Sequence, residues 1–101
     1  MIIRTWSARA DDSRADAYEE IFRNRVLAGL AALDGFAGAY LLRRPHGTGA
    51  ELMTLTLFDS MDAVRRFAGP EPDRAHVSAA ARAVLADADA RVRHFMVVSA
   101  P

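Results

Sequence analysis

The spacing of the apolar residues changes along the chain, and the order of these changes constrains the fold more than any other feature. In Ile2–Arg9, β-branched and aromatic residues alternate with polar ones, which predicts a strand. Apolar residues three and four positions apart then predict a helix with one apolar stripe. The stripe consists of Tyr18, Ile21, Phe22, Val26, Leu30 and Leu33. A strand followed by an amphipathic helix therefore opens the chain.

Cap and turn residues set the limits of this first helix. Asp12 or Ser13 is expected to cap its start, where a side-chain oxygen can accept from the free backbone N–H groups. Asp34 and Gly35 are expected to end it, because glycine readily adopts the left-handed conformation that closes a helix.

Two strands, two helical stretches and a last strand follow in the rest of the chain. The turn residues Pro45–Gly49 separate two strand-like segments and predict a hairpin. Ser60 is expected to cap a short helix, and Pro70–Pro72 is an irregular link into a second helical stretch. The segments are the strands 36–44 and 51–59, the helices 61–68 and 73–86, and the strand 91–99.

With the two helical stretches taken as one connection, the order is strand, helix, strand, strand, helix, strand. This order predicts an α+β, ferredoxin-like βαββαβ fold, in which a four-stranded antiparallel sheet carries its helices on one face. The length of 101 residues suits a single domain, since a division would leave two pieces too small for cores. Residues 1–101 are therefore predicted to form one domain.

Both faces of the predicted sheet are apolar. The third strand places Met53, Leu55 and Leu57 on one face, and Leu52 and Phe58 on the other. The helices can cover only one face, and a sheet face left in water usually carries polar residues. The sequence therefore predicts a homodimer, in which a second copy covers the open face by sheet-on-sheet packing.

Composition excludes several classes of function. The 13 basic residues balance 13 acidic ones, and the third strand offers aliphatic residues and threonine where RNA-recognition sheets stack bases, so no nucleic-acid partner is expected. The chain has no cysteine and no paired spacing among its three histidines, so no metal site is expected. No apolar run suits a signal peptide or a membrane span, which predicts a cytoplasmic protein without a membrane partner.

Three segments of the chain resemble one family. They are residues 34–40, Thr56–Gly69 and Val92–Phe95. In this order they are similar to the antibiotic biosynthesis monooxygenase family of the dimeric α/β-barrel superfamily, and the similarity extends over essentially the whole chain. The shared motifs are structural, so the resemblance implies the ferredoxin-like fold and a homodimer more directly than it implies a reaction.

The function that the resemblance implies is oxidation of a small aromatic substrate (phenolic, quinol or polyketide-like) by molecular oxygen, with no cofactor. A base removes a proton, and the resulting anion reacts with oxygen inside a dry pocket. The alternative is a non-catalytic dimer that binds a small ligand. Haem degradation, which another branch of the family performs, is disfavoured. The asparagine, tryptophan and histidine of that branch fall on or near Trp6, Phe67 and His76, so only the histidine is retained.

His76, His94 and Arg4 are the candidate catalytic residues. A histidine ordinarily titrates at about pH 6.5, which suits a general base at neutral pH. His76 is preferred because the resemblance places its segment in the pocket, and His94, central in the last strand, is the second choice. The alternatives are a solvent-facing position for His76 and a hydrogen-bonded position at the sheet surface for His94. Arg4 would hold the developing anion, although an ion pair would also explain it.

Five aromatic residues are the candidate substrate-binding residues. Trp6, which shares a strand face with Arg4, would form a flat wall with an indole donor, and Tyr40 would donate to a substrate oxygen. The other three would line an aromatic-binding cleft: Phe22, Phe58 and Phe67. For each of the five, packing in the core is the alternative.

Overall fold

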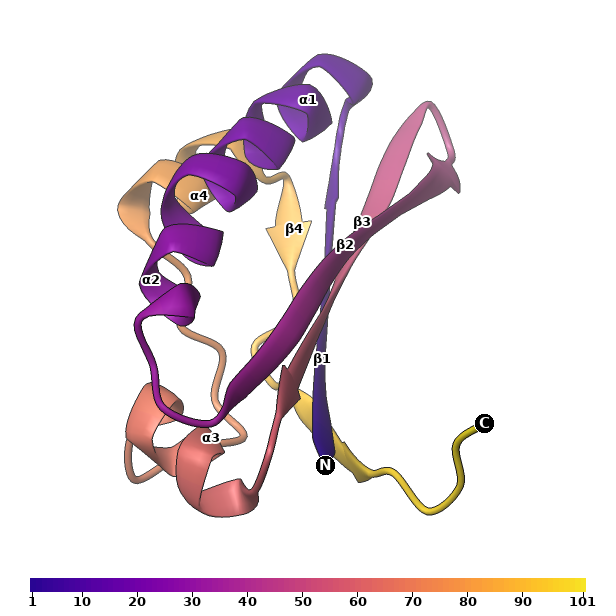
Figure 1. Cartoon of the computed structure of the whole chain (residues 1–101). Coiled ribbons are helices and arrows are strands. Elements are labelled where there is room, and N and C mark those ends of the chain that lie inside the picture. The colour runs from indigo at the N-terminus through magenta and orange to yellow at the C-terminus, as the bar shows by residue number, and fades with distance from the viewer.

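Five strands form one antiparallel sheet, and every helix lies on the same face of it (Figure 1). The computed structural model describes residues 1–101. The strands are β1 (Ile2–Ala10), β2 (Phe36–His46), β3 (Gly49–Phe58), β4 (Asp87–Ala88) and β5 (Arg93–Met96). Their order is β2-β3-β1, and both β4 and β5 pair with the remaining edge of β1. The predicted ferredoxin-like α+β fold is confirmed, with an open sheet.

The helical layer starts with one long helix in three parts. These are α1 (Asp12–Ile21), the π-helical turn η1 (Phe22–Val26) and α2 (Leu27–Ala31). The short helices α3 (Met61–Ala68) and α4 (Ala79–Val84) complete the layer. No helix has both the length and the apolar character needed to cross a membrane.

The caps and turns follow the sequence predictions, with one correction. Ser60 caps α3, where its hydroxyl accepts a backbone N–H of the first turn at 3.2 Å. Asp11, rather than Asp12 or Ser13, caps α1, so the first helix begins earlier than predicted. Gly35 has a φ of +85°, and a Cβ there would lie 2.6 Å from a side-chain carbon of α3. Glycine therefore lets the turn before β2 approach α3 closely.

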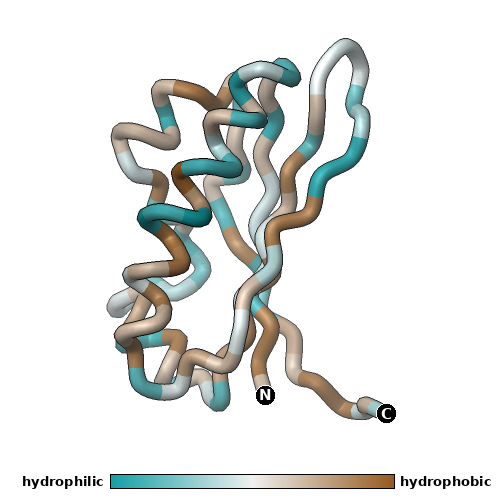
Figure 2. Tube along the Cα trace, turned by 45° about the horizontal axis from the view of Figure 1, so that its top comes forward, coloured by the Kyte–Doolittle hydropathy of each residue, from teal (hydrophilic) through white to brown (hydrophobic).

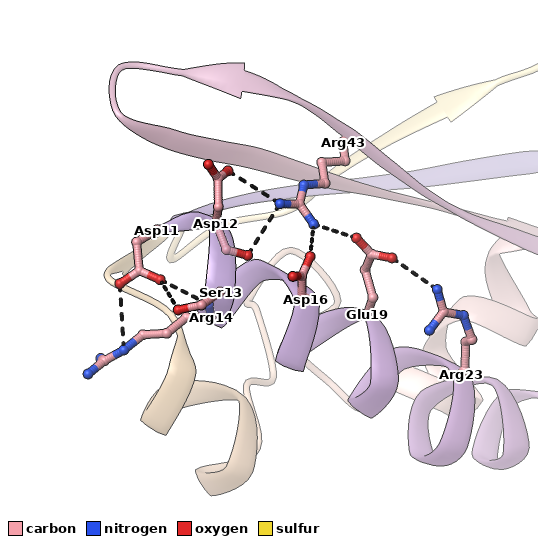
Figure 3. Close-up of polar contacts among 8 residues, drawn as sticks. All are labelled: Asp11, Asp12, Ser13, Arg14, Asp16, Glu19, Arg23 and Arg43. Atoms are coloured by element: carbon pink, nitrogen blue, oxygen red, sulfur yellow. Dashed lines mark hydrogen bonds and ion pairs between the residues drawn. The ribbon is translucent and has the colours of Figure 1, made fainter.

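An ion network joins the β2–β3 hairpin to α1 (Figure 3). Arg43 contacts the carboxylates of Asp12, Asp16 and Glu19 at 3.3, 2.5 and 2.6 Å. Glu19 also pairs with Arg23, one turn further along the helix, at 2.9 Å. The hydrogen bonds to these carboxylates raise the pKa of Arg43, so it stays charged. The network is structural, because each of its charges has a partner within the chain.

The second helical stretch is much shorter than predicted. The sequence predicts a helix over 73–86, whereas α4 contains six residues. The backbone of Asp73 and Ala75 bonds to Val92 and Ala90 instead of forming a helical turn, and Ser78 caps α4. Residues 69–78, which include His76, therefore form an irregular segment, here called the 69–78 loop.

The sequence predicts one strand over 91–99, whereas β5 contains only Arg93–Met96 and a separate short strand, β4, precedes it, so the edge strand is divided. β4 and β5 pair with β1 in registers that differ by two residues, so the residues between them leave the ladder. These residues bond to the 69–78 loop instead. Ala75 N–H donates to Ala90 C=O at 3.0 Å, and Val92 N–H donates to Asp73 C=O at 2.8 Å. The division of the edge strand thus holds the loop beside the sheet.

The sheet face opposite the helices is uncovered and carries exposed apolar residues. Tyr40 lies opposite Leu55 there, and Phe95 lies opposite Ile3. Tyr40 is 60% exposed and Phe95 is 52% exposed, which is high for aromatic residues on a sheet. Figure 2 shows hydrophobic stretches along the strands and in the C-terminal tail, which turns away from the helices. The uncovered face therefore carries the predicted apolar residues of β3, although Thr5, Ser7, Arg9 and Glu51 share this face.

Candidate functional site

A partly open cavity of about 140 Å³ lies between the helices and the sheet. Five predicted site residues line it: Arg4 and Trp6 from β1, Phe22 from η1, Phe67 from α3 and His76 from the 69–78 loop. The other lining residues are Tyr18, Val26, Leu30, Thr54, Thr56, Ala75, Val77, Ser78, Ala81 and Val92. The fold thus places one guanidinium and one imidazole among mainly apolar and aromatic walls.

The π-helical turn faces this cavity. Phe22 and Val26, the first and last residues of η1, both line it. A π turn holds more residues per turn than an α-helix, and such turns are frequent at functional sites. The stretch contains no glycine or proline, so nothing in the sequence signals the irregularity.

His76 reaches the cavity beside the carboxyl end of α3. Its Nε2 lies 2.8 Å from the carbonyl oxygen of Ala68. Because a carbonyl can only accept, Nε2 carries the proton, and Nδ1 of neutral His76 keeps its lone pair. This geometry suits Nδ1 of His76 to the part of a general base.

Arg4 is a buried cation that no carboxylate contacts. It is 6% exposed; Nη1 donates to Pro72 C=O at 2.5 Å, and Nη2 donates to Arg74 C=O at 3.4 Å. The guanidinium carbon lies 5.5 Å from the centre of the Phe67 ring, within cation–π range. Burial lowers the pKa of Arg4, and the charge of Asp73 partly offsets this. An aromatic anion in the cavity would therefore find an unpaired positive charge.

Trp6 forms a wall of the cavity, but its indole N–H is already engaged. The Nε1 atom donates to Asp89 C=O at 2.8 Å, and the indole lies 6.2 Å from the Tyr18 ring, centre to centre. The sequence prediction of an indole donor for a ligand is therefore wrong in this structure.

Four residues with a hydroxyl group line the cavity and are not among the site residues predicted from the sequence: Tyr18, Thr54, Thr56 and Ser78. Thr54 and Thr56 lie opposite Trp6 and Arg4 in the β1–β3 pairing, so they share the helix-facing side. The alternation of β3 could have shown this once the register was known. Ser78 caps α4 with its hydroxyl. Burial raises the pKa of Tyr18 to about 12, so its hydroxyl remains protonated.

Three predicted site residues lie outside the cavity. Tyr40 is on the uncovered sheet face, so the cavity offers it no contact with a ligand. Phe58 is fully buried in the core, where its ring packs 5.7 Å from that of Phe67. His94 contacts Arg4 from behind the cavity wall, at 2.9 Å. No three His, Cys, Asp or Glu side chains are grouped as metal ligands would be.

Comparison with known proteins gives matches only among solved structures. No model of a known protein family matches the chain, and no curated protein matches it. SnoaB, a cofactor-independent oxygenase from Streptomyces nogalater, superposes with a TM-score of 0.66 at 20% identity, covering 98% of this chain and 93% of SnoaB. A protein from Caulobacter crescentus, assigned as an antibiotic biosynthesis monooxygenase, gives 0.70 at 20% identity, covering 97% and 90%.

A third similar structure carries a porphyrin. A variant of MhuD with two manganese protoporphyrin IX molecules bound per active site superposes with a TM-score of 0.70 at 20% identity, covering 100% of this chain and 98% of MhuD. Identities at this level concern the fold. The chain therefore has the fold of the antibiotic biosynthesis monooxygenases, which confirms the fold that the resemblance in the sequence implies.

Proposed function

We propose that the protein is a cofactor-free monooxygenase that oxidises a small phenolic or quinol substrate with molecular oxygen. The observation that carries the proposal is the cavity that Arg4 and His76 line together with aromatic residues. Arg4 bonds to two backbone carbonyls and to His94 but to no carboxylate, and the bond of His76 to the backbone is made by Nε2, not by Nδ1. A cation and a base in an apolar space are what the formation of an aromatic anion requires.

The size of the cavity favours one aromatic ring. Its volume of about 140 Å³ is close to that of an engineered protein cavity, about 150 Å³, that binds benzene. Sites for larger drug-sized ligands measure about 300–1,000 Å³. We therefore propose a single-ring hydroquinone or phenol as the substrate.

Each residue of the cavity has a defined part in this reaction. His76 Nδ1 takes the phenolic proton, Arg4 stabilises the anion, and Trp6 and Phe67 hold the ring. For 1,4-hydroquinone, the anion and O₂ give 2-hydroxy-1,4-benzoquinone and water. One oxygen atom forms a bond to a ring carbon and the other leaves as water, and the substrate supplies all four electrons.

A porphyrin does not fit the cavity as this chain forms it. The macrocycle is far larger than a space that matches a single ring. In addition, Nε2 of His76 is the ring nitrogen remote from the backbone, and it donates to Ala68 C=O. It therefore has no free lone pair with which to bind a haem iron. The prediction that haem degradation is disfavoured is therefore kept.

Oxygen-isotope labelling tests the proposal. The purified protein, with 1,4-hydroquinone under ¹⁸O₂ and a metal chelator, is expected to give a hydroxyquinone with one ¹⁸O atom, and faster than two-ring or three-ring quinols. The control is Arg4→Met, which keeps an apolar side chain and removes the charge. Binding without label incorporation would contradict the proposal and support the alternative, a non-catalytic ligand-binding protein.

We further propose that the protein is a homodimer in the cytoplasm. The support is the uncovered apolar face, which contains Tyr40, Leu42, Leu55 and Phe95. A twofold axis through the face would place the same residues against each other, sheet on sheet.

A further inference from the structure

Arg4, His94 and Asp73 form a hydrogen-bonded chain behind the cavity wall. Arg4 Nη1 lies 2.9 Å from His94 Nε2, and His94 Nδ1 lies 3.1 Å from Asp73 Oδ1. The His94 side chain is 9% exposed and that of Asp73 is 70% exposed. The chain therefore runs from the cavity wall, through a buried imidazole, to a carboxylate at the surface.

The two ends of this chain fix the position of the proton on His94. A guanidinium can only donate, so Nε2 of His94 must accept. Nδ1 then carries the one ring proton and donates it to the carboxylate of Asp73. A second proton, on Nε2, would remove the acceptor and place two cations in contact. Burial and the charge of Arg4 accordingly lower the pKa of His94, while Asp73 opposes them.

The carboxylate of Asp73 is available to accept from His94, because the charged residues next to it in sequence pair with each other. Glu71 and Arg74 form their own ion pair at 3.1 Å. The backbone carbonyl of Asp73 accepts from Val92 N–H at 2.8 Å, so β5 and the edge beside it hold Asp73 by two bonds. The charged groups that act on His94 are Arg4 from β1 and Asp73 from the 69–78 loop.

We propose that His94 and Asp73 are positioning residues that orient Arg4 towards an aromatic anion in the cavity. Both Nη atoms of Arg4 are bonded to the 69–78 loop or to His94, whereas Nε has no partner within the chain. No buried side-chain nitrogen lacks a partner, so Nε is accessible, and Arg4 lines the cavity. The proposal rests on the proposed function in one respect, the binding of an aromatic anion by Arg4.

The first test reads the tautomer of His94 by NMR of the ¹⁵N-labelled protein and needs no ligand. We expect the proton on Nδ1 above the pKa of His94. Asp73→Asn keeps an acceptor for this proton but removes the negative charge, so the pKa of His94 should fall further. A proton on Nε2, or a pKa that Asp73→Asn leaves unchanged or raises, would overturn the proposal.

The second test measures the binding of benzenesulfonate, a single-ring probe that stays anionic throughout. In His94→Leu, which removes the acceptor, the dissociation constant should rise by about tenfold or more, the usual effect of losing a hydrogen bond to a charged group. In His94→Gln the amide oxygen can accept from Arg4, so affinity should return to within about threefold of wild type. Neither change should alter the binding of neutral benzamide.

The outcomes separate this proposal from the proposed function. If His94→Gln and His94→Leu bind benzenesulfonate equally well, with equal melting temperatures, His94 does not position Arg4. If the wild type fails to bind benzenesulfonate, the cavity does not bind an aromatic anion. Both proposals require Arg4 to bind such an anion, so the role of Arg4 would be contradicted in both. If binding and tautomer are as expected but no oxygen is incorporated, the positioning stands and the enzymatic function fails.

Discussion

Turnover of a single-ring hydroquinone is expected to fall by about 10²–10⁴-fold in His76→Ala, the range typical of removing a general base. The physical reason is that Nε2 of His76 is committed to Ala68 C=O, which leaves Nδ1 as the proton acceptor. The acidic residues lie mainly in caps, ion pairs and surface positions, and none lines the cavity. The measurement is kcat/KM from initial rates of oxygen uptake.

A matched control distinguishes loss of the base from loss of any histidine. His46 ends β2 at the hairpin turn, outside the cavity, so His46→Ala should retain the wild-type rate. Sedimentation and the melting temperature should show that His76→Ala stays folded and assembled. A wild-type rate in His76→Ala would make the assignment wrong. Because His94 lies outside the cavity and its Nε2 is bonded to Arg4, the substrate would then have to ionise without a protein base.

Leu55→Glu is expected to give monomeric or insoluble protein. Leu55 lies in the middle of the uncovered sheet face, opposite Thr5 on β1 and Tyr40 on β2. A twofold contact through this face would bury two unpaired carboxylates, and each costs several kcal/mol in a dry interface. Sedimentation equilibrium at micromolar concentration reads the mass directly, against a monomer of 11.0 kDa.

Ala83→Glu is the matched control for the added charge. Ala83 is exposed on α4, in the helical layer, so the same charge there should leave the mass at twice the monomer. A wild-type protein that sediments as a folded monomer would contradict the proposed dimer. So would a Leu55→Glu variant that stays fully dimeric.

Local rules predict the parts of the fold that depend on neighbouring residues. Ser60 caps α3 and Gly35 takes a left-handed conformation, because a hydroxyl acceptor and a missing Cβ act within one turn. The second helical stretch is shorter than its local pattern predicts, because contacts with a distant part of the chain override that pattern. Its apolar spacing is helical, but the backbone of Asp73 and Ala75 bonds to Val92 and Ala90, between β4 and β5, and these contacts are distant in sequence.

A single bulge explains why Tyr40 lies outside the cavity. The β2–β3 register shifts between Phe36 and Gly38, so Tyr40 lies opposite Leu55 on the uncovered face. Without the extra residue, Tyr40 would lie opposite Thr54 and face the helices, because a one-residue slip turns every side chain over. The sequence has a glycine, Gly38, at the bulge. A glycine in a strand does not by itself indicate a bulge, so the register shift could not be predicted from it.

The cavity could be predicted as a set of residue types but not as an arrangement. Arg4, Trp6, Phe22, Phe67 and His76 were predicted from their chemistry and from the family resemblance, and they do lie together. The bond of Trp6 to Asp89 and the chain from Arg4 to Asp73 depend on how the 69–78 loop and the divided edge strand meet. Neither has a local signal in the sequence.

The most direct test of the account is the acidity of a phenol bound in the cavity. The pKa of 4-nitrophenol, whose anion is yellow, is measured by absorbance against pH, free and bound to wild-type protein, in the absence of oxygen. A buried guanidinium beside the ring should lower the pKa of the bound phenol by about 1 to 3 relative to the free phenol. Arg4→Met should abolish this decrease. A bound phenol with an unchanged or higher pKa in the wild type would contradict the claim that the cavity is built to hold an aromatic anion.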